Sequence, residues 1–417
     1  MQYTLPYGKT SQTITIPKDY SVEYVSAKKI DTSPSFEKLV SQAFHQPLDT
    51  PLLSDLVRLG DSVVIVVDDH TRPCPSKQLL PIVLGELKTG GVVDSDITIL
   101  IGTGTHLPPT QDQLIELLGK SIIQKYNVIS NDNKNSSYVT IGSSSYDHDI
   151  KIHKTYVESD IKIVISDIEY HYFAGYGGTR KSILPGIASA ETIQKNHAMM
   201  FNEYATTGEL RRNPISIEMQ EAFDLAGCDF MIGAVLNQTH DIVGLWTGEA
   251  KKVMDYGVKL VDRLFTKKIR KKPDVIITAA DGSPHDINLY QALKAVHTAS
   301  KVLKKDGIIM LAAECAEGMG NKVYQDWLKN YSTAEEIKQG LQKKFIIGAH
   351  KAYYHRQIIE KNTVYLSSSF NPSFVKDQLG FNPVDNVEDF FYKLVSLKAD
   401  FNNILIVPKG STTRLVF

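Results

Sequence analysis

The sequence predicts an α/β protein made of two domains, each with a mostly parallel β-sheet, and an active-site cleft between them. The length of 417 residues is more than a single hydrophobic core usually supports. Short continuous apolar runs, SVVIVVDD at 62–69 and ITILIGTGTH at 97–106, suit strands that are covered on both faces, and helical stretches separate them. A basic run at 267–273, KKIRKKP, marks a linker between the domains.

Composition narrows the class of protein. The chain is 42% hydrophobic and 22% charged, as in ordinary globular proteins, and its formal charge of −1 provides no extended basic surface for nucleic acid. The three cysteines are far apart and lack C-x-x-C spacing, which disfavours a disulfide framework or a thiolate zinc site and fits a reducing cytoplasm. No window approaches the roughly 20 apolar residues that span a bilayer. We therefore expect a cytoplasmic protein that binds a small molecule, and neither nucleic acid nor membrane.

The first domain is expected to cover residues 1–266. Residues 1–26 alternate apolar and polar positions around a Gly8-Lys9 turn, which predicts a hairpin at an edge of the sheet that follows. That sheet receives the two apolar runs and a third strand, DIKIVISDIEY at 160–170. Further elements are predicted as helices from Ser76 to 91, over 182–198 with a break near Pro185, and over 250–265, and as a hairpin at 229–249.

The second domain is expected to be a smaller α/β unit at 273–399. Its predicted strands are 273–282, 307–314 and 363–370, and its clearest predicted helix is 386–400. The last strand, ILIVPKGS, lies within 400–417 and is a candidate to return to the first domain.

Polar residues follow each of the first two strands, where ligands bind in sheets of this kind. After the first come Asp69 and Arg72, and an arginine held by a following proline could fork onto a carboxylate or phosphate. After the second comes the loop Gly102-Thr103-Gly104, whose backbone N–H groups could face a phosphate, and then His106. The acidic pair at 68–69 has the alternative role of a helix cap or turn. The dinucleotide fingerprint G-x-G-x-x-G is absent.

The stretch 167–197 concentrates chemically capable residues. His171 follows the third strand, His197 ends the predicted helix, and Lys181 lies between them. Gly177 and Gly178 permit close backbone approach to a ligand. Each residue alone is more often an ordinary surface or core residue, so the hypothesis of a site depends on their combination.

Five motifs in this order resemble the lactate racemase family, which uses a nickel-pincer nucleotide. They are D-H-T-R-P, G-T-G-T-H, H-x-F-A-G-x-x-G-x-R-K-S-x-L-P-G-I-A-S, N-H and Y-Q-A-x-K, and they extend over essentially the whole chain. The resemblance implies that Lys181 forms a covalent thioamide link to the cofactor, pyridinium-3-thioamide-5-thiocarboxylic acid mononucleotide, and that His197 ligates its nickel. It implies acid/base roles for His106 and His171.

The resemblance also implies binding roles. It gives Asp69 a cofactor contact, and it gives Arg72, Tyr290, Gln291 and Lys294 substrate contacts; the loop residues Gly102, Thr103, Gly104, Gly177 and Gly178 are expected to contact the cofactor because of their backbone freedom and N–H groups. One position departs from the family pattern, because His350 stands where lactate-specific members carry a tryptophan near the substrate. The family further implies partner proteins that synthesise the cofactor.

The expected activity is racemisation or epimerisation of a 2-hydroxyacid, with lactate as the default, by hydride transfer to and from the cofactor. Two histidines suit this reaction because the 2-oxo intermediate must be reducible from either face, and a ring with a pKa near neutrality can move a proton in both directions. Two alternatives stay open from the residues alone. One is a metallohydrolase with His106, His171, His197 and Asp69 as ligands, and the other is a non-catalytic module that carries a nucleotide or cofactor.

Overall fold

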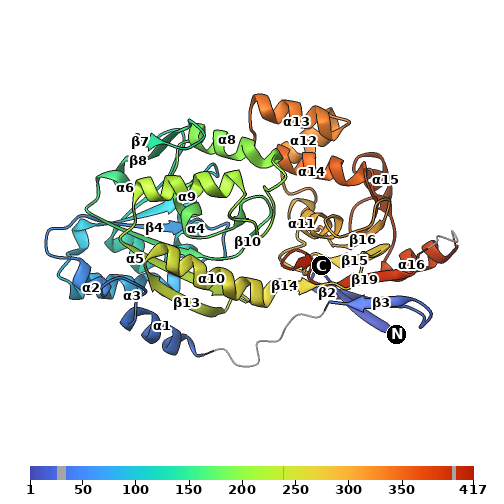
Figure 1. Ribbon diagram of the computed structural model, residues 1–417, viewed down its shortest axis with the longest axis horizontal. Helices are drawn as coiled ribbons and strands as arrows, with labels where there is room; N and C mark the ends of the chain where they lie inside the picture. The colour runs from blue at the N-terminus through green and yellow to red at the C-terminus, as the bar shows by residue number, and fades with distance from the viewer. Residues whose placement is uncertain (26–33, 238, 397–400) are drawn as a thin grey trace. The chain divides into compact units, whose positions relative to one another are not determined.

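The computed structural model describes residues 1–25, 34–237, 239–396 and 401–417. The chain forms two compact units. We call Ile30–Arg263 the middle unit, and we call Met1–Lys29 together with Leu264–Phe417 the terminal unit. Both have the predicted α/β character, with mostly parallel sheets (Figure 1). In the described part of the chain, no helix combines the length and the apolar character needed to cross a membrane.

The middle unit is built on a six-stranded sheet in the order β13-β12-β9-β4-β5-β6. All neighbours pair in parallel except β12 and β13, which form the predicted hairpin. The strands are β4 (Val63–Asp68), β5 (Ile97–Gly102), β6 (Asn127–Ser130), β9 (Ile161–Asp167), β12 (Phe230–Leu236) and β13 (Ile242–Gly248). Two small antiparallel pairs accompany it, β7 (Tyr138–Ser143) with β8 (Asp149–His153) and β10 (Tyr170–His171) with β11 (Gly175–Tyr176).

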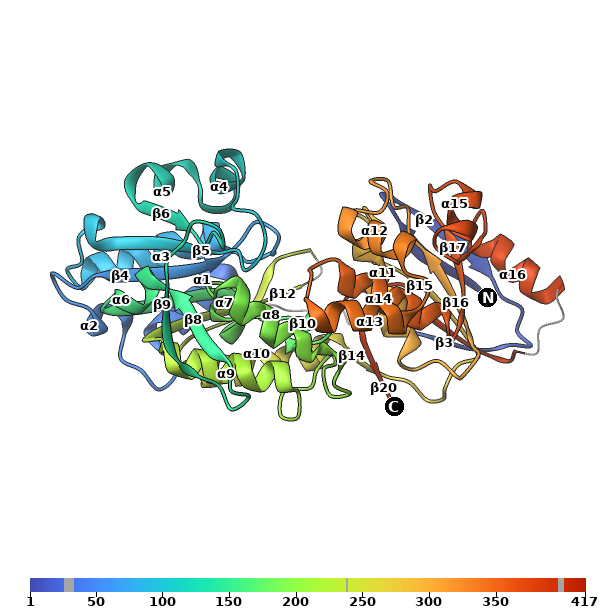
Figure 2. The same cartoon turned by 90° about the horizontal axis from the view of Figure 1, so that it is seen from above.

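Helices cover both faces of this sheet (Figure 2). They are α1 (Phe36–His45), α2 (Leu53–Leu56), α3 (Ser76–Thr89), α4 (Gln111–Leu118), α5 (Lys120–Lys125), α6 (Lys154–Glu158), α7 (Arg180–Ile183), α8 (Ala190–Ala198), α9 (Pro214–Ala226) and α10 (Ala250–Phe265), with short 3-10 turns at Asp94–Asp96 and Met199–Phe201. Alternate residues of β4, Val63, Ile65 and Val67, share one apolar cluster with α1 and α3. The intervening residues of β4 are equally buried, which explains why its sequence is continuously apolar.

The terminal unit has a second six-stranded sheet, in the order β18-β17-β16-β15-β19-β3, and all of its neighbours pair in parallel. Its strands are β3 (Ser21–Tyr24), β15 (Val275–Ala279), β16 (Ile308–Ala312), β17 (Thr363–Ser367), β18 (Asn382–Pro383) and β19 (Asn403–Val407). The short strands β14 (Thr266–Lys268) and β20 (Arg414–Val416) pair beside it. Its helices are α11 (Leu289–Ser300), α12 (Lys322–Asn330), α13 (Ala334–Lys343), α14 (Ala349–Ile359), α15 (Pro372–Asp377) and α16 (Val387–Ser396).

The predicted N-terminal hairpin exists, but it belongs to the terminal unit. Strands β1 (Gln2–Tyr7) and β2 (Thr10–Thr15) pair as expected, and Leu5, Ile14 and Ile16 are fully buried in a cluster with residues of β15, β19 and α16. The expected place at an edge of the first domain's sheet is therefore wrong. The alternating pattern identifies an apolar face, and it carries no information about which sheet covers that face.

The division into domains also differs from the expected one, because both ends of the chain belong to one unit. The chain enters the terminal unit, leaves it for the middle unit, and returns at Leu264. Strand β19 lies between β15 and β3 in the sheet of the terminal unit, so the strand within 400–417 does not return to the first domain. The expected boundary near residue 266 is close to the observed change of unit at Leu264, whereas the structure places both residues 1–25 and the C-terminal strand in the terminal unit.

Candidate functional site

The first two strand ends of the middle unit carry a histidine–aspartate pair. Nδ1 of His106, which follows β5, lies 2.7 Å from Oδ2 of Asp69, which follows β4. Thr71 donates to the other oxygen of Asp69 from its hydroxyl at 2.6 Å and from its backbone N–H at 3.0 Å. Burial alone would raise the pKa of Asp69, but the hydrogen bond and charge of His106, with Thr71, outweigh burial and lower it. The carboxylate is thus held in place, and the His106 ring remains 40% exposed.

Acidic side chains surround Arg72 at the same sheet edge. Its Nη1 lies 3.4 Å from Oε1 of Glu169, and although burial opposes this, the charges of Glu169, Asp167 and Asp68 raise the pKa of the guanidinium. Burial raises the pKa of Asp68 to about 6, and burial with the nearby Glu169 raises that of Asp167 well above its usual range. The arginine is a permanent cation among carboxyls, two of which are held toward their neutral form.

The glycine-rich loop brings Lys181 to this edge by packing closely against the end of β9. Gly178 has a φ of +79°, and a Cβ there would lie 2.5 Å from the carbonyl oxygen of Asp167. A Cβ on Gly177 would lie 3.1 Å from Glu169 Cγ, and its N–H donates to the Glu169 carbonyl. The backbone therefore requires glycine at 178, whatever else the loop binds, whereas a Cβ at 177 would press on the Glu169 side chain. The helix α7 that follows ends before Pro185, as the sequence predicts, and Ser182 donates to Asp68 at 2.9 Å.

Lys181 and His197 are both driven toward their neutral forms. Burial, with the charge of Arg72, lowers the pKa of Lys181 well below its usual value. Burial, with the charge of Lys181, lowers the pKa of His197 to about 3. The ring of Phe173 contacts both His171 and His197, at centroid distances of 4.5 and 5.1 Å. One compact region therefore holds an amine whose pKa is strongly lowered, a neutral imidazole and a second histidine.

The loop after β5 is held by other parts of the chain. The N–H of Gly104 donates to the Gly186 carbonyl at 2.8 Å, and the hydroxyl of Thr103 donates to the Asn131 carbonyl. A Cβ on Gly102 would lie 3.3 Å from Gly186 Cα. In this structure the Gly104 N–H is thus engaged, so the expected cradle for a phosphate does not include it. The loop instead fixes the turn that leads to His106.

The remaining predicted residues lie in the terminal unit on α11 and α14. Tyr290, Gln291 and Lys294 are half-buried on α11, and His350 is 4% exposed at the start of α14. The rings of Tyr290 and His350 meet edge to face at 6.4 Å. Nδ1 of His350 accepts from the backbone N–H of Gly348 at 3.2 Å. The predicted site residues thus form two groups, one in each unit.

Sequence reasoning missed several residues of these groups. Asp167 ends β9 as Asp68 ends β4, and Glu169 comes shortly after β9, so the rule that found Asp69 could have found them. Lys351 gives no comparable signal. It is 4% exposed, its Nζ lies 5.3 Å from the centre of the Tyr290 ring, and burial, with the charge of Lys294, lowers its pKa far below the usual value.

The ligands required by a hydrolase of the kind considered above are not gathered. Among the described residues, Asp68, Cys74 and Asp167 form the group of three or more potential metal ligands within 4.8 Å. It includes neither the three candidate histidines nor Asp69. Burial raises the pKa of all three of its members, and Ser182 and Ser76 hydrogen-bond two of them, so this group is better explained as part of the packed sheet edge.

Comparisons with known proteins agree along the whole chain. Residues 7–208 match the lactate racemase N-terminal domain, and residues 268–414 match the lactate racemase C-terminal domain. The lactate racemase of Thermoanaerobacterium thermosaccharolyticum is 30% identical over 97% of both chains, and that of Lactiplantibacillus plantarum is 28% identical over the same shares.

Solved structures show the same likeness at the level of the fold. The lactate racemase apoprotein from T. thermosaccharolyticum superposes with a TM-score of 0.89 at 29% identity and full coverage of both chains. A protein from Thermotoga maritima, at 18% identity, shares the fold with a TM-score of 0.63 over 87% of this chain and 96% of its own. The α/β prediction is confirmed. The chain is therefore an isomerase, a racemase, and belongs to the lactate racemase family.

Proposed function

We propose that this protein racemises or epimerises a 2-hydroxyacid, with lactate as the first substrate to test, and that it uses a nickel-pincer nucleotide attached to Lys181. The observation that carries the proposal is a pair of nitrogen groups with strongly lowered pKa values in one region. Lys181 and His197 both have strongly lowered pKa values in a place where Arg72 provides a fixed cation. A neutral amine can form a covalent bond, and a neutral imidazole can ligate a metal.

The donor chemistry of the region fits such a cofactor. Imidazole is a common nickel ligand, and His197 is neutral without any metal to displace its proton. Lys181 is half-buried and adjoins carboxyls that keep the region from being purely cationic. Arg72 and Asp69 could hold polar groups of the nucleotide or substrate. When bound, the cofactor would supply a carbon that accepts hydride from the substrate Cα and returns it.

The two candidate acid/base histidines begin from opposite states. Nδ1 of His106 faces the Asp69 carboxylate, so it carries the proton and leaves a lone pair on Nε2 that can take the hydroxyl proton of the substrate. Nδ1 of His171 accepts the Ala174 N–H at 3.1 Å, so its own proton sits on Nε2. One ring therefore starts as a proton acceptor and the other as a donor, as a reaction needs when it enters from one face and leaves from the other.

A cation is the natural partner for the substrate's carboxylate. Arg72 and Lys294 are the proposed holders, with Tyr290 and Gln291 as further contacts. His350 would lie near the substrate's side chain, where it offers less volume than tryptophan and a polar ring. Proteins that synthesise and insert the cofactor are proposed as partners.

The test is to load the protein with the cofactor and nickel, and then to follow L- and D-lactate separately by chiral chromatography. We expect each enantiomer to approach an equal mixture, and we expect intact-mass and peptide analysis to find the added mass on the peptide that contains Lys181. An unmodified Lys181 in a protein that still racemises would overturn the covalent assignment. If Lys181 carries the adduct but the protein racemises no 2-hydroxyacid, the alternative of a non-catalytic module that carries the cofactor would be favoured.

A further inference from the structure

A buried polar chain connects helix α9 to His197. Glu218 on α9 and Asn196 on α8 are both fully buried, although one is a carboxylic acid and the other an amide. Nδ2 of Asn196 donates to Oε2 of Glu218 at 2.9 Å, and Oδ1 of Asn196 lies 3.1 Å from Nδ1 of His197. Burying a polar group costs free energy unless it is hydrogen-bonded, so Glu218 and Asn196 depend on these hydrogen bonds.

The partners of Asn196 fix the orientation of its amide. Besides Glu218, its Nδ2 donates to the backbone carbonyl of Ile215 at 3.2 Å. The Ile215 carbonyl can accept but cannot donate, so the NH₂ end must face it and Oδ1 must face His197. An amide oxygen only accepts. The Nδ1 of His197 therefore carries a proton, and in the neutral ring Nε2 is left as the nitrogen with the lone pair.

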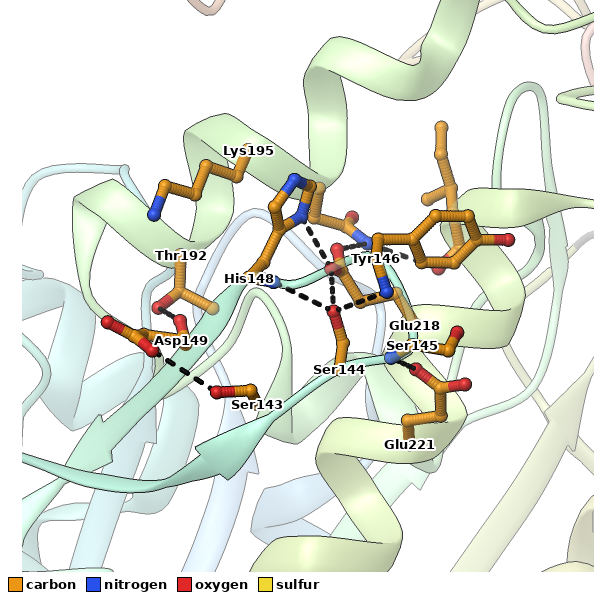
Figure 3. A network of polar contacts seen from close by, with 12 residues as sticks. Ser143, Ser144, Ser145, Tyr146, His148, Asp149, Thr192, Lys195, Glu218 and Glu221 are labelled. Carbon is orange, nitrogen blue, oxygen red and sulfur yellow. Dashed lines mark hydrogen bonds and ion pairs between the residues drawn. The ribbon is translucent and has the colours of Figure 1, made fainter.

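Glu218 is itself held by the β7–β8 turn (Figure 3). Its Oε1 accepts from the Ser144 hydroxyl at 2.7 Å and lies 2.7 Å from Nδ1 of His148. The Ser144 oxygen in turn accepts the backbone N–H groups of Tyr146 and His148. Every oxygen of Glu218 thus has a partner, and the hydrogen bonds lead from a surface turn to the histidine at the end of α8.

We propose that Glu218 and Asn196 are positioning residues that present Nε2 of His197 to the metal. The inference rests on the proposed role of His197 as the nickel ligand. A histidine that ligates a metal commonly donates a hydrogen bond from its other ring N–H to a group that sets its tautomer and orientation. Losing such a group typically costs about 10–100-fold in metal affinity. In this protein the N–H of His197 Nδ1 donates to the side-chain amide of Asn196. The carboxyl of Glu218 helps to orient that amide so that its oxygen faces His197.

The first test measures nickel retention in cofactor-loaded protein during challenge with a chelator, together with the visible absorption of the metal site. Glu218→Met removes both acceptors at similar volume, and we expect nickel to dissociate about 10–100-fold faster. Glu218→Gln keeps one acceptor and should restore most of the retention. Glu221→Met is the matched control, because Glu221 lies on the same helix and accepts from the Ser145 backbone without reaching Asn196. Equal retention in Glu218→Met and Glu221→Met overturns the proposal.

The second test uses protein without cofactor and without any substitution at Glu218 or Asn196. In unloaded wild-type protein labelled with ¹⁵N-histidine, the His197 resonances, assigned by their loss in His197→Ala, should show the proton on Nδ1. A proton on Nε2 overturns the proposal even if Glu218→Met fails to fold. The two failures are distinguishable: loaded wild type without nickel, or nickel retained fully by His197→Ala, contradicts the proposed function, whereas normal nickel binding with the wrong tautomer contradicts only this inference.

Discussion

Each unit of the molecule holds a lysine whose pKa burial lowers far below its usual value, and the two surroundings differ. Lys181 lies at a strand-end edge among Asp68, Glu169 and Arg72, on a loop packed against its own backbone. Lys351 lies on α14 over the Tyr290 ring, with Lys294 as the neighbouring charge that lowers its pKa further. Mixed charges around an amine whose pKa is lowered suit a group that reacts, whereas two lysines together suit a place that attracts an anion.

The largest expected effect comes from removing the amine itself. Lys181→Ala should abolish racemisation and the covalent adduct, because no other group could form the link, and it should leave the melting temperature nearly unchanged. Lys351→Ala is the comparison, and it should keep the adduct. Activity assays with intact-mass analysis check both, and an adduct in Lys181→Ala would erase the distinction between the two lysines.

The next effect tests whether the middle unit holds the acid/base groups. His106→Ala should reduce kcat for both enantiomers by about 10²–10⁴-fold, the usual cost of losing a general base. His240, an exposed histidine in the β12–β13 turn, provides the control His240→Ala, which should be neutral. Near-normal racemisation in His106→Ala, in either direction, would show that the Asp69–His106 pair is structural.

A smaller effect tests the anion-attracting role of the terminal unit. Lys294→Met should raise KM for the 2-hydroxyacid about 10–100-fold, because a hydrogen bond to a charged group is worth about 1.5–3 kcal/mol. The control Lys301→Met, at the C-cap of the same helix, should leave KM unchanged. If kcat falls while KM stays constant, Lys294 contributes to the chemical step and not to binding, and the proposed anion-attracting role of the terminal unit is wrong.

Specificity should change less than binding. His350→Trp should shift the ratio of kcat/KM toward lactate and away from longer or hydroxylated 2-hydroxyacids by about tenfold, because pocket volume usually discriminates by about 1–3 kcal/mol. Tyr353 on the same helix is another aromatic residue that could close the pocket against a small side chain, but its hydroxyl already accepts from Nε2 of Gln357 at 3.1 Å. A wild type that prefers lactate and does not respond to the substitution would remove His350 from the argument.

The smallest effect concerns the carboxyls around Lys181. Because the pKa of Asp68 is raised to about 6 from 3.8, its contribution to stability is fully present below pH 3.8 and is lost as the pH rises through 6. Asp68→Asn should remove that slope and raise the unfolding free energy at pH 7 by at most about 3 kcal/mol. Urea unfolding at several pH values checks this, and a slope equal to that of wild type would contradict it.

Much of the molecule was predictable, for identifiable reasons. The strands β4, β5 and β9 are continuously apolar because they are covered on both faces, and parallel strands bring their carboxyl ends together, which is why Asp69 and His106 could be expected to meet. The break at Pro185 follows from its missing N–H.

The rest depended on tertiary contacts that local patterns do not encode. Nothing in residues 1–26 says that Leu5 and Ile14 pack with β15, since any sheet could cover the same apolar face. Lys351 looks like a surface lysine until α11 and α14 are packed together. Glu218 looks like a solvent-facing helical residue until Ser144 and Asn196 are found around it.

The return of the chain to its first unit has a consequence for synthesis on the ribosome. Strand β3, at Ser21–Tyr24, is among the first segments made, yet its partner β19 ends at Val407. At about 5–20 residues per second, the N-terminal segment waits on the order of 20–80 s for that partner. The middle unit is complete before then, so it can fold while the terminal unit still lacks its C-terminal part, Leu264–Phe417. A fragment limited to 268–414 would lack Leu5, Ile14 and Ile16, and we expect it to aggregate unless the first 25 residues are supplied.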